Sequence, residues 1–117
     1  MNKYDLMNRT KKFSARVYFL ADQLPATPGA KNVNYQLMRS SSSVAANYRA
    51  ACRAKSKADF INKLKIVEEE ADESLFWLEY MEEVNLVKDS NEHKLLKCEA
   101  NELVAIFTSS LRTMKAA

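Results

Sequence analysis

Arginine and lysine side chains recur at helical spacing in one part of this 117-residue chain, and these side chains are suited to binding phosphate. Arg39 and Arg53 are fourteen positions apart, which is two heptads, and Arg49 lies one helical turn before Arg53. Guanidinium groups hold phosphate oxygens through paired hydrogen bonds, and each phosphate contact releases counterions from the nucleic acid. The spacing therefore predicts a basic helix face that binds nucleic acid.

The candidate nucleic-acid-binding set extends past this helix and includes three bases of the N-terminal segment. It comprises Arg39, Arg49, Arg53, Lys55, Lys57, Lys11, Lys12 and Arg16. An alternative interpretation is a solvated surface, or one whose cations form salt bridges with acids of a neighbouring copy. No base-reading motif accompanies these residues, so we expect low sequence specificity.

The charges of the chain are separated along the sequence, although the net charge is only +3. The segment 23–58 contains six bases and no acid, whereas the segment 59–102 contains thirteen acids and five bases. Such asymmetry indicates a polyanionic partner for the basic segment, or a second copy that pairs basic with acidic surface.

Five carboxylates on two helices that we expect to be antiparallel neighbours raise the question of a metal site. They are Glu69, Asp72, Glu73, Glu99 and Glu102. Di-iron bundles use a Glu-x-x-His motif on each of two helices, but His93 is the sole histidine and Ser90 stands three residues before it. We therefore predict no metal and no cofactor, and interpret the glutamates as a solvated or inter-subunit face.

Catalytic motifs are also missing from the sequence. The run from Ser40 to Ser43 lies far from the only histidine, and a single glycine cannot build a phosphate loop or an oxyanion loop. Cys52 and Cys98 stand apart, which favours two free thiols over a disulfide. We predict that the protein is not an enzyme.

The breakers of regular structure are confined to one place, because the only glycine and both prolines lie within residues 25–29. Apolar spacing elsewhere predicts four amphipathic helices joined by short connections. Their expected bounds are about 4–24, 32–54, 57–87 and 90–114. The prediction is an all-α fold with one domain over 1–117, an antiparallel up-down-up-down four-helix bundle.

Two features of these helices predict close contacts. The third helix has more apolar residues than one stripe needs, so we expect an oligomer interface there. That interface comprises Glu69, Asp72, Glu73, Phe76, Trp77 and Tyr80. The small side chains of Ser40 to Ser43 allow a neighbouring helix to approach closely. Gln36 and Asn47 lie near an apolar face, so we expect them to form hydrogen bonds between helices.

Nothing in the sequence indicates a membrane partner. No run approaches the roughly 20 apolar residues that span a bilayer, and the N-terminal residues lack the apolar core of a signal peptide. We predict a cytoplasmic protein.

The segment 35–83 closely resembles the bacterial four helix bundle protein family. The matching motifs are Gln36-Leu-Met-Arg39, Ser43-Val-Ala-Ala-Asn47, Arg49 and Glu69-Glu-Ala-Asp-Glu-Ser74. The family includes proteins encoded in intervening sequences of 23S rRNA genes and the accessory variability protein of diversity-generating retroelements. In the commoner pattern a glycine ends Asn-Ile-Ala-Glu-Gly, but Asn47-Tyr-Arg-Ala-Ala51 stands here, so we expect the helix to continue.

The resemblance implies a four-helix protomer assembled into a barrel-shaped homopentamer. In the retroelement member, the basic surface of the pentamer binds nucleic acid and the reverse transcriptase. The expected function is thus a non-enzymatic homo-oligomer that binds nucleic acid, RNA or a ribonucleoprotein. The alternative is a protein-interaction scaffold or an accessory subunit, with a reverse transcriptase as one candidate partner.

Overall fold

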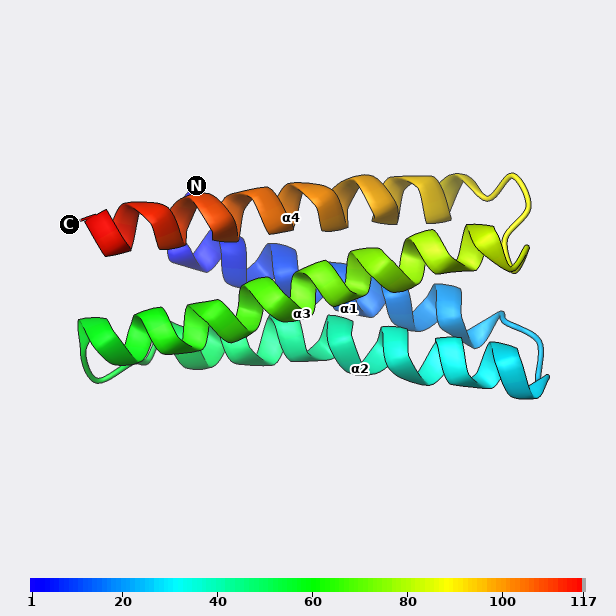
Figure 1. Ribbon diagram of the computed structural model, residues 1–117, viewed down its shortest axis with the longest axis horizontal. Helices are drawn as coiled ribbons and strands as arrows, with labels where there is room; N and C mark the ends of the chain where they lie inside the picture. The colour runs from blue at the N-terminus through cyan, green and yellow to red at the C-terminus, as the bar shows by residue number, and fades with distance from the viewer. Residues whose placement is uncertain (117) are drawn as a thin grey trace.

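The computed structural model describes residues 1–116 and shows four helices, each antiparallel to the helix before it (Figure 1). They are α1 (Lys3–Asp22), α2 (Pro28–Ala51), α3 (Lys57–Glu83) and α4 (Asn91–Ala116). No strand occurs in these residues, and the bundle measures 46 × 21 × 20 Å. The predicted all-α, up-down-up-down bundle is therefore confirmed.

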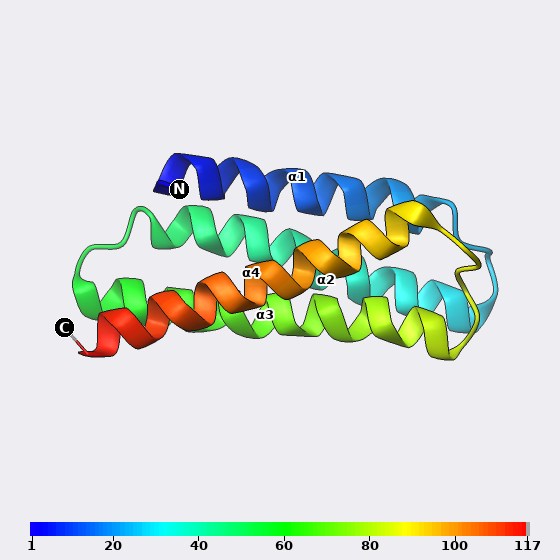
Figure 2. The same ribbon diagram turned by 90° about the horizontal axis from the view of Figure 1, so that it is seen from above.

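The helices follow one another around the bundle, so that α1 packs on α2, α2 on α3, and α3 on α4. The fourth side of the bundle, between α4 and α1, has the fewest contacts. Figure 2 shows the reason, because α4 runs obliquely and stays close to α1 over only part of its length. Two bidentate ion pairs, Arg9–Glu99 and Arg16–Glu92, join α1 to α4 along this side.

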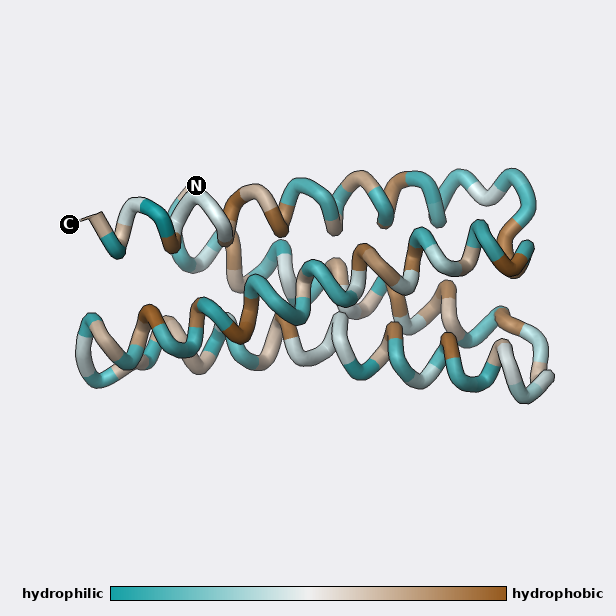
Figure 3. Tube along the Cα trace, in the orientation of Figure 1, coloured by the Kyte–Doolittle hydropathy of each residue, from teal (hydrophilic) through white to brown (hydrophobic). Residues whose placement is uncertain are grey.

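The core is built from one apolar stripe of each helix, and Figure 3 shows these residues recurring among polar ones along the chain. Phe13 of α1, Leu37 of α2, Leu78 of α3 and Phe107 of α4 are all at most 1% exposed. Burial of side chains of this size contributes about 1.5–3 kcal/mol each. This burial orients every helix and so decides which side chains are left to face the solvent.

The second helix begins four residues earlier than predicted. Thr27 is its N-cap and accepts a hydrogen bond from the Ala30 amide at 3.3 Å, and Pro28 occupies the first position of the helix. Proline fits there because its fixed φ suits a helix and its missing N–H has no partner in the first turn. From the sequence, both prolines were interpreted as helix breakers, and that interpretation was wrong for Pro28.

The third helix ends four residues earlier than predicted, at Glu83. Asn85 follows with a φ of 56°, and the amide of Leu86 donates to the Met81 carbonyl at 2.9 Å. Asparagine is the residue that most often replaces glycine in this left-handed helix-ending position. Because no glycine marks this position, the sequence analysis placed the end of the helix too late.

Small side chains bring α2 and α3 together, as the serine run predicted. Ser40 and Ser74 are fully buried, and the Ser74 hydroxyl donates to Ser40 Oγ at 3.0 Å. The expectation for Asn47 was wrong, since its amide donates within α2 to the Ser43 carbonyl and hydroxyl. Asn34 forms an inter-helix bond instead, donating to the Ala21 carbonyl at 2.9 Å.

Candidate nucleic-acid interface

Most of the cations gather in the half of the bundle that holds the N-terminus, the end of α4 and the α2–α3 connection (Figure 1). The segments 1–12, 46–66 and 106–116 carry twelve of the eighteen bases and two of the fifteen acids, a net charge of +10. We call these three segments the basic end. Its charge exceeds that of the whole chain, so the rest of the molecule is acidic.

The topology produces this charge. Antiparallel packing places the start of α1 beside the end of α2, and the start of α3 beside the end of α4. Bases that are a hundred positions apart in sequence, such as Lys12 and Arg112, therefore belong to the same half of the molecule. A concentration of one sign of charge attracts polyanions over a distance of about one Debye length, roughly 8–10 Å.

Six of the eight predicted phosphate-binding residues belong to the basic end. They are Lys11, Lys12, Arg49, Arg53, Lys55 and Lys57, and all six are exposed. Arg49 and Arg53 form no salt bridge with residues 1–116, and the same is true of Lys11 and Lys12. Their charged groups are thus available for an external anion.

Arg39, in contrast, is held by acids of its own chain. Its guanidinium donates to Glu70 at 3.0 Å and to Glu73, both on α3. The hydrogen bond to Glu73 raises the pKa of Arg39 above its usual value, and the charge of Glu70 raises it too. Any phosphate at Arg39 has to compete with two carboxylates.

Arg16 is also paired, at the seam between α1 and α4. It donates to both carboxylate oxygens of Glu92, through Nε at 3.0 Å and Nη2 at 2.8 Å. Seven residues before Arg16, Arg9 forms the same kind of bidentate pair with Glu99, at 2.6 and 2.7 Å. The two arginines are seven residues apart on α1, and the two glutamates are seven residues apart on α4. Equal spacing on two antiparallel helices allows both pairs to form at once. The sequence reading missed this role of Arg9.

The predicted oligomer-interface residues form two groups on α3. Glu69 and Asp72 are exposed, whereas Glu73 contacts Arg39 and accepts a hydrogen bond from Trp77 Nε1 at 3.1 Å. Phe76 lies with Trp77 and Tyr80 in an aromatic cluster whose ring centroids are 4.9–5.9 Å apart. Phe76 is 51% exposed and Tyr80 is 38% exposed. The cluster therefore presents apolar rings to the solvent.

A groove between α1 and α2 adds an aromatic ring to the basic end. Tyr4 and Lys11 line it from α1 and Arg49 from α2, with Ala45 and Ala46 along α2 between them, around a hollow of about 600 Å³. Tyr4 is 65% exposed. The sequence reading overlooked Tyr4, although the periodicity of the first helix places it off the apolar stripe. An exposed ring next to two cations is suited to stacking on a base.

The carboxylates considered for a metal site are used elsewhere or lie apart. Glu99 and Glu102 contact Arg9, and within residues 1–116 no three His, Cys, Asp or Glu side chains are placed to hold a metal ion. The buried ring of His93 forms a hydrogen bond of 2.7 Å through Nε2 with the Leu78 carbonyl. Among the described residues, no helix is long and apolar enough to cross a membrane.

Comparison with known proteins identifies relatives over nearly the whole chain. The fold is similar to the crystal structure of a protein of unknown function from the S23 ribosomal protein family of Bacteroides thetaiotaomicron. The two share 27% sequence identity with a TM-score of 0.83, over 96% of this chain and 99% of the other. No curated protein sequence matches. The family model of the 23S rRNA-intervening sequence protein matches residues 2–109, and the chain therefore belongs to that family.

Proposed function

We propose that this protein is a non-enzymatic homo-oligomer that binds nucleic acid, RNA or a ribonucleoprotein, through the basic end and with low sequence specificity. The observation that supports this is the net charge of +10 on the basic end, combined with four exposed bases that form no salt bridge with residues 1–116, namely Lys11, Lys12, Arg49 and Arg53. A solvated surface that serves only solubility needs no such concentration of one sign of charge, because mixed charges serve equally well.

The type of binding follows from the side chains. Lys11, Lys12, Arg49 and Arg53 supply phosphate contacts, and Tyr4 supplies a surface on which a base stacks. Phosphates are the same for every sequence, and stacking accepts any base. Binding with low sequence specificity is therefore the expected behaviour.

A homopentamer is the assembly we propose. Its support is the resemblance of the sequence motifs to a family whose members form five-fold barrels, together with the exposed aromatic cluster on α3. Several basic ends in one assembly increase the avidity for a long strand, because the second contact becomes intramolecular. This effect lets a modest patch on each protomer hold a polyanion firmly.

The experiment compares two double variants of equal charge. Arg49→Gln with Arg53→Gln removes two cations of the basic end, and Lys88→Gln with Lys94→Gln removes two exposed cations from the opposite half. Each phosphate contact contributes about 0.7–0.9 to the slope of log affinity against log salt concentration. We expect the first variant to lose about 1.5 units of slope and to bind every sequence more weakly, while the second stays close to wild type.

Filter binding with single-stranded RNA over a salt series measures both affinity and slope. Equal losses in the two variants would mean that net charge, and not the basic end, governs binding. Wild-type affinity in both variants, with unchanged slopes, would favour the alternative function, a scaffold for a protein partner such as a reverse transcriptase.

A further inference from the structure

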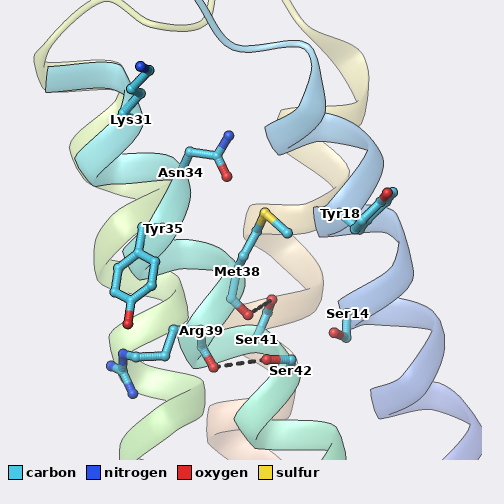
Figure 4. A pocket seen from close by; sticks show the side chains of 9 residues that line it. All are labelled: Ser14, Tyr18, Lys31, Asn34, Tyr35, Met38, Arg39, Ser41 and Ser42. Atoms are coloured by element: carbon cyan, nitrogen blue, oxygen red, sulfur yellow. Dashed lines mark hydrogen bonds between the residues drawn. The ribbon is translucent and has the colours of Figure 1, made fainter. Parts of the chain in front are cut away.

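A second groove between α1 and α2 lies in the opposite half of the bundle and differs in character from the basic end (Figure 4). It encloses about 530 Å³ and is lined mainly by apolar atoms. Tyr18 of α1 stands on one side and Tyr35 of α2 on the other, with Met38 between them. Tyr18 is 51% exposed and Tyr35 is 66% exposed, so two aromatic rings face the solvent here beside the half-buried Met38.

The floor of this groove is made of small side chains. Ser14 from α1 and Ser42 from α2 contribute to the lining, and Ser41 lies behind them (Figure 4). The hydroxyls of Ser41 and Ser42 are already used, since they donate to carbonyls one turn back in α2. A floor of small residues accommodates the side chains of an approaching helix, and the hydroxyls of Ser41 and Ser42 stay paired when it is covered.

Charge argues against nucleic acid as the occupant. Arg39 at the lower rim is paired with two glutamates, which leaves Lys31 as the one lining cation without a salt bridge to residues 1–116. A single lysine offers little to a phosphate backbone. The nine residues that line the groove also include no acid. It therefore suits an apolar surface that carries some negative charge.

The chain itself carries such a surface on the outside of α3. An exposed stripe with helical spacing runs along that helix, with two rings in its centre and acids on both sides. Its members are Glu69, Asp72, Phe76, Tyr80 and Glu83. Glu69, Asp72 and Glu83 form no salt bridge with the described residues. We call these five residues the α3 stripe.

The dimensions of the two surfaces agree. The α3 stripe spans about 21 Å along its helix, and the part of α2 that lines the groove, from Lys31 to Ser42, spans about 17 Å. We propose that the α3 stripe of one copy docks in the α1/α2 groove of Figure 4 on a second copy. Phe76 and Tyr80 then pack against Tyr18, Tyr35 and Met38, and the acids approach Lys31 and the tyrosine hydroxyls.

This contact is heterologous, because each protomer contributes a groove on one side and a stripe on the other. Repetition of a heterologous contact closes into a ring when the rotation permits. The inference rests on the proposed self-assembly and names the surfaces that carry it out. It leaves the basic end uncovered, since Tyr18, Tyr35 and the α3 stripe all lie outside the segments that define that end.

Two substitutions at exposed positions test the contact. Tyr35→Glu places a carboxylate in the groove, and Phe76→Glu places one in the centre of the α3 stripe. Leu95→Glu is the matched control, because Leu95 is a 50% exposed apolar residue on α4, outside both surfaces. Far-UV circular dichroism checks that each variant is folded. Light scattering then gives the mass at micromolar protein concentration.

We expect the wild type and Leu95→Glu to be oligomeric, and the Tyr35→Glu and Phe76→Glu variants each to be monomeric. A mixture of the two monomeric variants should form a dimer that grows no further, because one intact stripe meets one intact groove. If Tyr35→Glu and Phe76→Glu each remain oligomeric, this contact is refuted. Loss of assembly in Phe76→Glu alone indicates a stripe-to-stripe interface and also refutes it.

Binding of a short oligonucleotide of about six nucleotides, within the length of one site, separates this inference from the proposed function. We expect Tyr35→Glu to bind it as the wild type does. Loss of that binding would assign the groove to nucleic acid and overturn the docking contact. If the wild type is a monomer, both the docking contact and the proposed self-assembly are refuted. If the wild type is an oligomer that does not bind RNA, only the proposed nucleic-acid binding is refuted.

Discussion

The arginines of this protein divide into two groups that sequence spacing does not distinguish. Arg9, Arg16 and Arg39 each hold a carboxylate of another helix, while Arg49, Arg53 and Arg112 face the solvent and form no salt bridge within residues 1–116. The difference arises from the neighbours, because glutamates of α4 and α3 lie within salt-bridge distance of the first three arginines, and the salt bridges of residues 1–116 include none to Arg49 or Arg53. Salt bridges fix helix register in the first group, and an external anion remains possible for the second.

Replacing Arg16 by glutamine should lower the free energy of unfolding near neutral pH by up to about 1 kcal/mol, as for other partly exposed ion pairs. The hydrogen bond from Arg16 holds the pKa of Glu92 below its usual 4.5. This stabilisation is complete above 4.5 and is lost as the pH falls through the lowered pKa of Glu92. The difference between the variant and the wild type should therefore disappear in acid.

Urea unfolding at about pH 7 and in acid measures this difference in unfolding free energy with Glu92 charged and with Glu92 increasingly protonated. Lys12→Gln serves as the control, since Lys12 lies on the same helix without a salt bridge to the described residues. An Arg16→Gln deficit of equal size at both pH values would show that the arginine stabilises through packing and not through Glu92.

At the scale of helices, small residues determine how closely α2 approaches α3. Ser40 is fully buried, donates to the Leu37 carbonyl and accepts from Ser74. A serine run is a poor helix former by itself, but α2 continues through it to Ala51 because both neighbouring helices pack against it. The helix ends at Ala51, where the family pattern has a glycine, so the expectation that it continues to about residue 54 was wrong. The amides of Arg53 and Ala54 donate three residues back, to Ala50 and Ala51, instead of four.

Replacing Ser40 by leucine should destabilise the protein by about 1–3 kcal/mol, because the larger side chain has no space between the two helices. Ser109→Leu on the exposed face of α4 should change the stability by less than about 0.5 kcal/mol. Thermal or urea unfolding of both variants gives the comparison. Similar stabilities would mean that α2 and α3 can separate without cost.

At the scale of the whole molecule, folding converts a charge pattern along the chain into a charge polarity in space. The basic end has a net charge of +10, while the rest of the bundle contains thirteen of the fifteen acids. The apolar surfaces proposed to join copies, around Tyr35 and Phe76, lie outside the basic end. The proposed nucleic-acid binding and the proposed assembly thus use separate parts of the bundle.

Raising the salt concentration should therefore separate the two activities. Screening shortens the reach of charge from about 8 Å at physiological ionic strength to about 3 Å at 1 M, which weakens phosphate contacts but not the packing of aromatic rings. We expect RNA to dissociate while the mass from light scattering stays constant. Simultaneous loss of RNA and of the oligomer would indicate that the copies are joined mainly by charge.

The sequence by itself determined the local features of this protein. Four apolar stripes with a period of 3.6 residues and the confinement of breakers to residues 25–29 were enough to predict four helices and an all-α bundle. Helix ends were predicted less well, because Pro28 starts a helix and Asn85 ends one through backbone conformations that neighbouring residues decide. The family resemblance also rested on the sequence alone, and the match over residues 2–109 confirms it.

Only the tertiary structure decided which basic residues are paired within the chain and which are available to bind an external anion. Arg39 and Arg49 look equivalent in the sequence, but the carboxylates that hold Arg39 belong to α3 and stand more than thirty positions away. The grooves between α1 and α2 likewise need side chains from both helices. Periodicity is a property of one helix, whereas ion pairs, grooves and the gathering of twelve bases at one end depend on how separate helices meet.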